Sequence, residues 1–400
     1  MAFLAVDAHS ISIPLAMLIV FGAAKLFAEI FERIGQPAIV GEILAGAVVG
    51  PSLLGWIQPN EVLTALSELG VMFLLFRVGL EVKSSELMQV GGTAVMVALL
   101  GVLAPMGLGW SIMRAWGYSQ VESVFVGAAM VATSVGITAQ VLAAKGLLHL
   151  QSSKIILGAA VIDDILGLIV LAIVSSAAKG QVNVLEISAT AVAAIGFTII
   201  VAKWGTTAMT RFVPQAESRL KSGEAQFNVA LVLLFTLSVL AIYVGVAAII
   251  GAFLAGMALA ESVSERVHDL AHGITEMLVP FFLAGIGLHL DVTAFADRNL
   301  LLLAVVILIA AVLSKLIGCG VGAMRLGAKE MLRIGCGMVP RGEVGMVVAQ
   351  LGLSMTVIEE PVYAVVVFMA VATTIIAPAL LNMAYKGAPA RDAEEQFHIG

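Results

Sequence analysis

The sequence has little charge. Only 12% of its 400 residues are Asp, Glu, Lys or Arg, about half the share found in ordinary soluble domains, whereas 60% are hydrophobic and the mean hydropathy is +1.07. This composition excludes a water-soluble domain. Strands of alternating polar and apolar residues are also lacking, so the pattern indicates an all-α polytopic membrane protein.

Cysteine and histidine are scarce as well. The two cysteines, Cys319 and Cys336, fall in or beside late apolar runs, and the six histidines show no metal-ligand spacing. We therefore expect two reduced core cysteines, and neither a disulfide framework nor a resident metal or cofactor.

Apolar runs of roughly 20 residues, the length that crosses a hydrocarbon core, recur along the whole chain. The first run lacks the basic start and the small-residue cleavage site of a signal peptide, so it is expected to be retained as a helix. About thirteen transmembrane spans are predicted, at residues 12–33, 38–55, 62–81, 90–113, 122–145, 153–178, 184–211, 226–243, 246–262, 271–290, 298–324, 331–353 and 361–385.

Basic residues are distributed unevenly between the two sets of loops. Loops after odd-numbered spans hold 13 lysines and arginines, and the other loops hold 3. By the positive-inside rule the N-terminus lies outside and the C-terminus is cytoplasmic. Opposite locations of the two ends agree with an odd number of spans.

Two sequence segments recur in the second half of the chain. Residues 40–46 (VGEILAG) return as residues 250–256 (IGAFLAG), and residues 73–80 (FLLFRVGL) return as residues 281–288 (FFLAGIGL). The shift is seven spans, an odd number, so the two halves run in opposite orientations. This predicts an inverted repeat of six spans, one linker span and six spans, with a transport site at the interface of the repeats.

Spans 5 and 12, which the repeat makes equivalent, both carry helix-breaking sequence at residues 132–138 (ATSVGIT) and 338–345 (MVPRGEVG). Pro340 has no backbone N–H to donate. The ends of broken helices direct unpaired carbonyl and amide groups at an ion, and Thr133 and Ser134 would add hydroxyl oxygens. Two discontinuous helices at a transport site are therefore predicted; close packing by small residues is the alternative for the first break.

Two adjacent aspartates, Asp163 and Asp164, interrupt the apolar span at residues 153–178. A carboxylate inside a membrane is costly and normally marks an ion or proton path. Adjacent helical side chains point about 100° apart, so the two carboxylates are expected to have different surroundings. Lys315 lies at the same depth, about 15 Å from the cytoplasmic helix ends, and is expected to pair with Asp163. Because protonation removes the charge that holds a cation, one carboxylate can exchange Na⁺ for H⁺ by competition.

Other polar residues in the spans are interpreted as structural. Arg341 and Glu343 are expected to neutralise the half-helix dipoles beside Pro340, with Gly342 and Gly136 at the same depth. Nearer the N-terminus, Lys25 and Glu29 have the i,i+4 spacing of a helical ion pair, and Glu42 is interpreted as a polar packing residue.

The motifs at residues 36–46, 132–139, 158–167 and 340–345, together with Lys315, resemble those of NapA-type Na⁺/H⁺ antiporters. These belong to the Kef/NapA-like second family of monovalent cation:proton antiporters. The resemblance spans nearly the whole chain, and it implies an antiporter (NhaA-like) fold in which spans 5 and 12 are the crossed discontinuous helices.

The resemblance also implies roles for individual residues. Asp164 would be the principal ion-binding carboxylate, Asp163 the partner of Lys315, and Thr133 and Ser134 neighbours of the ion. The metal at Asp164 and Asp163 would be transported Na⁺. The Asp-Asp pair resembles the electrogenic class of exchangers.

The family further implies a homodimer and an elevator movement of a core domain. Expected partners are membrane lipid, a second copy and the transported cation, with no nucleic acid, in a bacterial inner membrane. The expected division of the chain is residues 1–112 for spans 1–4 (spans 1–3 in the dimerisation domain, span 4 in the core), 113–180 for core spans 5 and 6 with the ion site, 181–222 for the linker span, 223–293 for dimerisation spans 8–10, 294–385 for core spans 11–13, and 386–400 for a short cytoplasmic tail.

Two other transport functions stay open. K⁺/H⁺ antiport could use the same scaffold, although related potassium systems usually have Gln-Asp where this chain has Asp163 and Asp164. A Na⁺-coupled organic anion symporter needs a larger polar cavity, and few polar residues are left to line one. An enzyme is not expected, because an intramembrane aspartyl protease uses aspartates on two different helices.

Overall fold

Helices are the only regular secondary structure in the residues that the structure describes. The computed structural model describes residues 12–34, 36–178, 184–219, 224–290, 295 and 297–389. Its fifteen α-helices are α1 (Ile13–Arg33), α2 (Ala38–Val49), α3 (Glu61–Leu80), α4 (Ser84–Ala115), α5 (Gln120–Ala129), α6 (Val135–Ala144), α7 (Gln151–Ala178), α8 (Val184–Arg219), α9 (Ala225–Tyr243), α10 (Ala248–Leu259), α11 (Glu265–Leu288), α12 (Arg298–Gly322), α13 (Ala328–Gly337), α14 (Glu343–Ser354) and α15 (Glu360–Ala384).

Each predicted span corresponds either to one continuous helix or to a pair of short helices. The pairs are α5 with α6 and α13 with α14, at the two predicted breaks. Nine of the described helices are long and apolar enough to cross a membrane, whereas α2 and α10 have only 12 residues each. The all-helical polytopic fold is confirmed, and thirteen crossings stay a prediction.

Four predicted span ends differ from the observed helix ends by six to eight residues: the end of α2, the beginnings of α4 and α11, and the end of α8. The second span was expected to reach residue 55, but α2 ends at Val49. The reason is Pro51, which disfavours helical geometry in the residue before it, Gly50. Conversely, α11 begins at Glu265, before the apolar run at residue 271, because a helix can extend beyond the membrane with polar residues.

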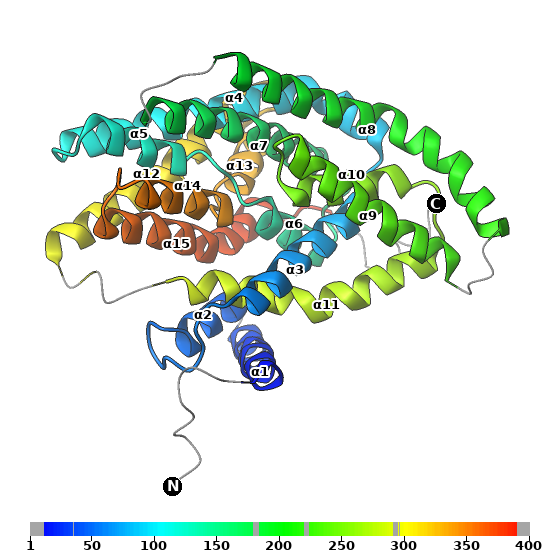
Figure 1. Ribbon diagram of the computed structural model, residues 1–400, viewed down its shortest axis with the longest axis horizontal. Coiled ribbons are helices and arrows are strands. Elements are labelled where there is room, and N and C mark those ends of the chain that lie inside the picture. The colour runs from blue at the N-terminus through cyan, green and yellow to red at the C-terminus, as the bar shows by residue number, and fades with distance from the viewer. Residues whose placement is uncertain are drawn as a thin grey trace, which may run out of the picture.

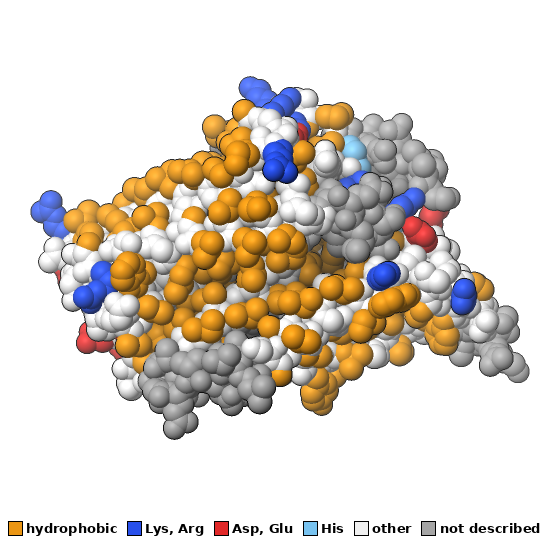
Figure 2. All heavy atoms as spheres, turned by 90° about the horizontal axis from the view of Figure 1, so that it is seen from above, with side chains coloured by type: hydrophobic (Ala, Val, Ile, Leu, Met, Phe, Trp, Pro, Cys, Tyr) orange, Lys and Arg blue, Asp and Glu red, His pale blue; other side chains and the backbone are white. Residues whose placement is uncertain are grey.

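A broad band of hydrophobic side chains covers the face shown in Figure 2, and the charged side chains lie mostly toward its margins. Many large apolar residues are exposed, for example Leu18, Val192 and Ile309 on α1, α8 and α12. So much exposed apolar surface fits contact with lipid, since soluble monomers rarely expose large apolar patches. The two cysteines are free and buried.

Glycines bring the repeated segments into backbone contact. A Cβ atom on Gly46 of α2 would overlap the α11 backbone, and one on Gly287 of α11 would overlap the α2 backbone. The equivalent pair is Gly256 of α10 against α3 and Gly79 of α3 against α10. Helices α2 and α11 therefore cross as α10 and α3 do, which supports the inverted repeat; the repeat itself stays a prediction.

The helices pack in two groups (Figure 1). The first helix group comprises α1, α2, α3, α9, α10 and α11, and the second comprises α4, α5, α6, α7, α12, α13, α14 and α15. Helix α8 contacts α9 and α10 of the first group and α4 and α7 of the second. Contacts between the groups include α3 with α6 and α2 with α15, so the predicted site elements α7, α12 and the broken helices lie together in the second group.

Candidate ion-binding site

A buried ion pair joins α7 to α12. The Lys315 ammonium donates to both carboxylate oxygens of Asp163, with Nζ 3.0 Å from Oδ1 and 3.1 Å from Oδ2. Both side chains have no exposed surface. Their equal depth along two oppositely directed helices predicted this contact, and the contact is present.

Room for the lysine head comes from α4. A Cβ atom on Gly101 would lie 3.3 Å from Lys315 Nζ and 2.7 Å from Cys319 Sγ. A side chain at this position would force the Cys319 side chain to move and would crowd the ammonium group beside Asp163. The sequence analysis did not single out Gly101, because an isolated glycine in an apolar span has no distinguishing pattern.

Asp164 has different surroundings from its neighbour. It retains 7% of its surface exposure, whereas Asp163 has none. The difference follows from the 100° rotation between adjacent helical residues, which turns only one of the two carboxylates toward Lys315. Two buried carboxylates thus lie in one turn of α7, and a lysine pairs with one of them.

The two broken helices cross at their extended segments. The backbone N–H of Ser134, between α5 and α6, donates to the carbonyl of Pro340, between α13 and α14, at 2.8 Å. A Cβ atom on Gly342 would lie 2.6 Å from Ser134 Oγ, so only glycine allows this approach. Thr133 and Ser134 are both buried, and Thr133 Oγ1 has no hydrogen-bond partner within the described part of the chain. Among the described residues, the Thr133 hydroxyl oxygen is therefore available to contact an ion.

Gly136 has a packing role rather than a place at the crossing itself. A Cβ atom on this residue would lie 2.9 Å from Val71 Cγ2 and 3.2 Å from the ring of Phe282. These residues belong to α3 and α11, so the start of α6 lies directly against the first helix group.

Arg341 is fully buried among carbonyl groups. Its guanidinium donates to the carbonyls of Met338 (3.2 Å) and Val339 (2.9 Å), just after α13 ends, and to the carbonyl of Ala311 in α12 (3.1 Å). A cation at the C-terminal end of a helix stabilises the unpaired carbonyls and the negative end of the helix dipole. The Glu343 backbone begins α14, but its side chain lies outside the described residues.

Two threonines on α15 hold the second break, and the sequence analysis missed both. The hydroxyl of Thr373 accepts from the Arg341 N–H at 3.1 Å, and the hydroxyl of Thr374 donates to the Arg341 carbonyl at 2.6 Å. An adjacent pair of threonines in an otherwise apolar helix was the available signal. They satisfy the backbone groups that Pro340 and the break leave without helical partners.

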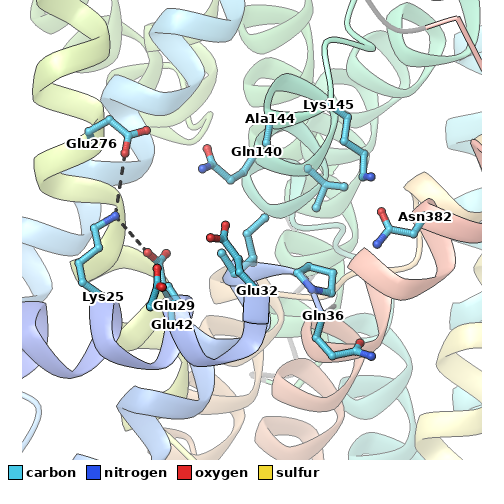
Figure 3. Close-up of a pocket in the computed structure, with 15 residues that line it drawn as sticks. Lys25, Glu29, Glu32, Gln36, Glu42, Gln140, Ala144, Lys145, Glu276 and Asn382 are labelled. Carbon is cyan, nitrogen blue, oxygen red and sulfur yellow. Dashed lines mark hydrogen bonds and ion pairs between the residues drawn. The ribbon is translucent and has the colours of Figure 1, made fainter. Parts of the chain in front are cut away.

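An open cavity lies between the two helix groups (Figure 3). Its volume is about 710 Å³, and α1, α2 and α11 form one side while α6 and α15 form the other. The expected Lys25–Glu29 pair is wrong: Lys25 Nζ lies 3.2 Å from Glu42 Oε1, and Glu29 pairs instead with Arg33 at 2.7 Å. Tertiary contact with α2 thus replaces a local helical pairing.

Comparison with known proteins identifies the family. The family model described as "Sodium/hydrogen exchanger, transmembrane" matches residues 16–386. The chain belongs to this family.

Among curated members, this sodium/hydrogen exchanger is 34% identical to the high-affinity Na⁺/H⁺ antiporter NhaS3 of Synechocystis, over 96% of this chain and 92% of that one. It is 35% identical to the Na⁺/H⁺-K⁺ antiporter GerN of Bacillus cereus, over 91% of this chain and 94% of that one. Among solved structures, the sodium proton antiporter MjNhaP1 of Methanocaldococcus jannaschii matches with a TM-score of 0.71 at 16% identity, covering 94% and 97% of the two chains. The antiporter fold is thereby confirmed.

Proposed function

We propose that this protein exchanges Na⁺, and also Li⁺, for H⁺ across a bacterial inner membrane, with its N-terminus outside and its C-terminus in the cytoplasm. The observation that carries the proposal is the position of Asp164 on α7, next to the Asp163–Lys315 ion pair. The sodium–proton exchange named for its relatives NhaS3 and GerN supports it.

In this proposal Asp164 binds Na⁺ and H⁺ alternately. An ionised carboxylate attracts a hard cation, and protonation removes that attraction, so the two ions compete for one group. Asp163, Thr133 and Ser134 supply further oxygens near the ion, whereas Lys315 balances the charge of Asp163. With two carboxylates and one lysine, the site can take up more than one proton for each Na⁺, which makes the exchange electrogenic.

The charge of Arg341 keeps the break in α13–α14 stable while ions come and go. Its guanidinium donates to two carbonyls at the end of α13 and so stabilises the negative end of that helix dipole. Glu343 is the nearest carboxylate in sequence and lies at the start of α14. Pro340, Gly342 and Gly136 maintain the crossing and its contact with the first helix group. No cofactor takes part in this mechanism.

Access alternates by an elevator movement of the second helix group against the first. Each group has an apolar cluster of its own, one in α1, α2, α3 and α11 and another in α4, α5, α7, α12, α14 and α15. A third and larger cluster joins the two groups, for example where α6 packs against α3 and α11. The first group forms the dimerisation domain and pairs with a second copy. The cavity in Figure 3 opens between the groups and is lined by Glu32 in the last turn of α1 and by Lys145 after α6, at helix ends that the basic-residue distribution assigns to the cytoplasm.

K⁺/H⁺ exchange is a second candidate, favoured by the relative GerN, which is named a Na⁺/H⁺-K⁺ antiporter. Both ions are hard cations that bind carboxylate and carbonyl oxygens. The same proteins in the same assay, driven by either salt, distinguish the two functions.

The test is Na⁺- and K⁺-driven proton movement in proteoliposomes that contain wild-type protein, Asp164→Asn or Asp269→Asn. Asp269→Asn is the matched control, because it is the same substitution on an exposed residue of α11. We expect Na⁺-driven exchange in the wild type and the control and none in Asp164→Asn. Persistent exchange in Asp164→Asn would overturn the site, and absence of cation-driven proton flux in the wild type would overturn the function.

A further inference from the structure

The cavity between the two helix groups can serve ion entry if the protein performs the proposed cation–proton exchange. With a volume of about 710 Å³, the cavity holds on the order of 20 water molecules. It is therefore large enough to hold a hydrated monovalent cation on the predicted cytoplasmic side.

Charge is arranged asymmetrically around this cavity. The first helix group contributes four carboxylates and one lysine, whereas the opposite wall contributes the amide side chains of Gln140 and Asn382 and a lysine, Lys145, directly after α6 (Figure 3). The Oε1 atom of Gln140 is buried with no hydrogen-bond partner among the described residues. The ionisable groups that line the cavity are Glu29, Glu32, Glu42, Glu276, Lys25 and Lys145, which gives a formal charge of −2 when all are ionised.

Glu42 is the least accessible of these carboxylates. Its side chain is only 7% exposed, and the Lys25 ammonium lies 3.2 Å from Oε1. Lys25 itself is 41% exposed, and its Nζ lies 3.9 Å from Glu276 Oε2, a carboxylate that is 53% exposed. The lysine thus has a second, hydrated partner toward which it can move.

We propose that Glu42 binds the transported cation transiently on its way to the site, and that Lys25 competes with the cation for this carboxylate. A buried carboxylate stays ionised only with a positive partner, which is the ammonium when the cavity is empty of cation and the cation when it is not. As the cation binds, Lys25 shifts to Glu276. The lysine acts as a tethered competitor, so it raises the cation concentration needed for half-maximal exchange.

The location of the pair supports this role over a packing role. Lys25, Glu42 and Glu276 lie on α1, α2 and α11, all within the first helix group, so the pair does not join the two groups. Those three helices are already held by glycine-mediated contacts such as Gly41 of α2 against the backbone of α1. A partly exposed ion pair adds little to that packing, because water and salt screen it.

The test measures KM for Na⁺ and the maximal rate in proteoliposomes of the full chain, with Na⁺ presented to the face where the cavity opens. Lys25→Gln is expected to lower KM by about threefold to fivefold, the scale of a partly exposed ion pair, with little change in the maximal rate. Lys25→Arg retains the competitor and is expected to keep the wild-type KM. Lys145→Gln, the matched control, removes a lysine that lines the same cavity and is expected to leave KM unchanged.

Glu42→Gln distinguishes competition from a general change in cavity charge. It is expected to raise KM, and Lys25→Gln added to it should have no further effect because the contested carboxylate is gone. Two outcomes would overturn the inference: an unchanged KM in Lys25→Gln, whether or not its melting temperature and maximal rate fall, or an equal fall in KM in Lys145→Gln. The proposed function is tested separately. If wild-type protein exchanges the ions and Asp164→Asn does not, that function is supported whatever the KM values of the Lys25 variants are.

Discussion

The buried pair of Asp163 and Lys315 makes a quantitative prediction about stability. Neither side chain has exposed surface, and the ammonium contacts both carboxylate oxygens. Removing one partner leaves the other charge buried and uncompensated, at a cost of about 3 to 5 kcal/mol. With an unfolding entropy of about 2.1 cal/mol/K per residue over 400 residues, this corresponds to a fall in melting temperature of about 4 to 6 °C.

The assay is a double-mutant cycle in detergent, with melting followed by size-exclusion fluorescence. Lys315→Gln and Asp163→Asn should each give the full loss, because each leaves one buried charge. The double variant replaces both charges by amides that can bond to each other, so it should be more stable than either single variant. We expect a coupling of about 2 kcal/mol or more, within the range for residues in direct contact.

The control is a solvent-exposed ion pair of similar length. Arg266 Nη2 lies 3.0 Å from Glu224 Oε1, with side chains 61% and 42% exposed. Arg266→Gln should cost less than about 1 kcal/mol. Additive losses in the Asp163 and Lys315 cycle would refute the reasoning, since additivity means that the two charges do not compensate each other in the folded protein.

Two further predictions concern the crossing and the cytoplasmic end of α3. Gly342→Ala should reduce exchange and folded yield, because the new methyl group would lie 2.6 Å from Ser134 Oγ. Gly22→Ala is the control and should behave as wild type, because a methyl group there would meet no described atom of another helix within 4 Å. Equal behaviour of the two variants in transport and melting assays would contradict the crossing geometry. Burial raises the pKa of Glu81 from 4.5 to about 7, against an opposing effect of Arg77, so its contribution to stability is full below about pH 4.5 and is lost as pH rises through 7. The free energy of unfolding of the wild type should thus fall by on the order of 3 kcal/mol between pH 4.5 and pH 8. The melting temperature of Glu81→Gln should change less with pH than that of the wild type or of the exposed control Glu261→Gln. Parallel pH profiles for all three proteins would refute this.

Sequence patterns located most of the helices because the membrane imposes a strong local constraint. Every backbone polar group in lipid must bond within its own helix, so long apolar runs predict helices directly. The breaks were equally visible, since Pro340 and the glycines around it cannot continue a helix. The same reasoning failed at α2, where an apolar run continued past the point at which Pro51 ends the helix.

Partners across the fold were predicted only where depth left few choices. A lysine and an aspartate that are buried at equal depth in a membrane are expected to form an ion pair, and Lys315 and Asp163 form one. Beside the open cavity that constraint is weak, because a charged side chain there can reach water. Lys25 therefore pairs with Glu42, 17 residues away, instead of with Glu29 one turn along its own helix.

The sequence by itself determined that this is a polytopic helical membrane protein, where its helices break, and which carboxylates lie deep inside it. Those properties depend on hydropathy, on the missing donor of proline and on the cost of burying charge, all of which are local. Only the tertiary structure decided that Thr373 and Thr374 hold the backbone of Arg341, that Gly101 leaves room for Lys315, and that a cavity lined by Lys25 and Glu42 separates the helix groups. These contacts join helices far apart in the chain, and their geometry depends on how the helices cross, which no single segment encodes.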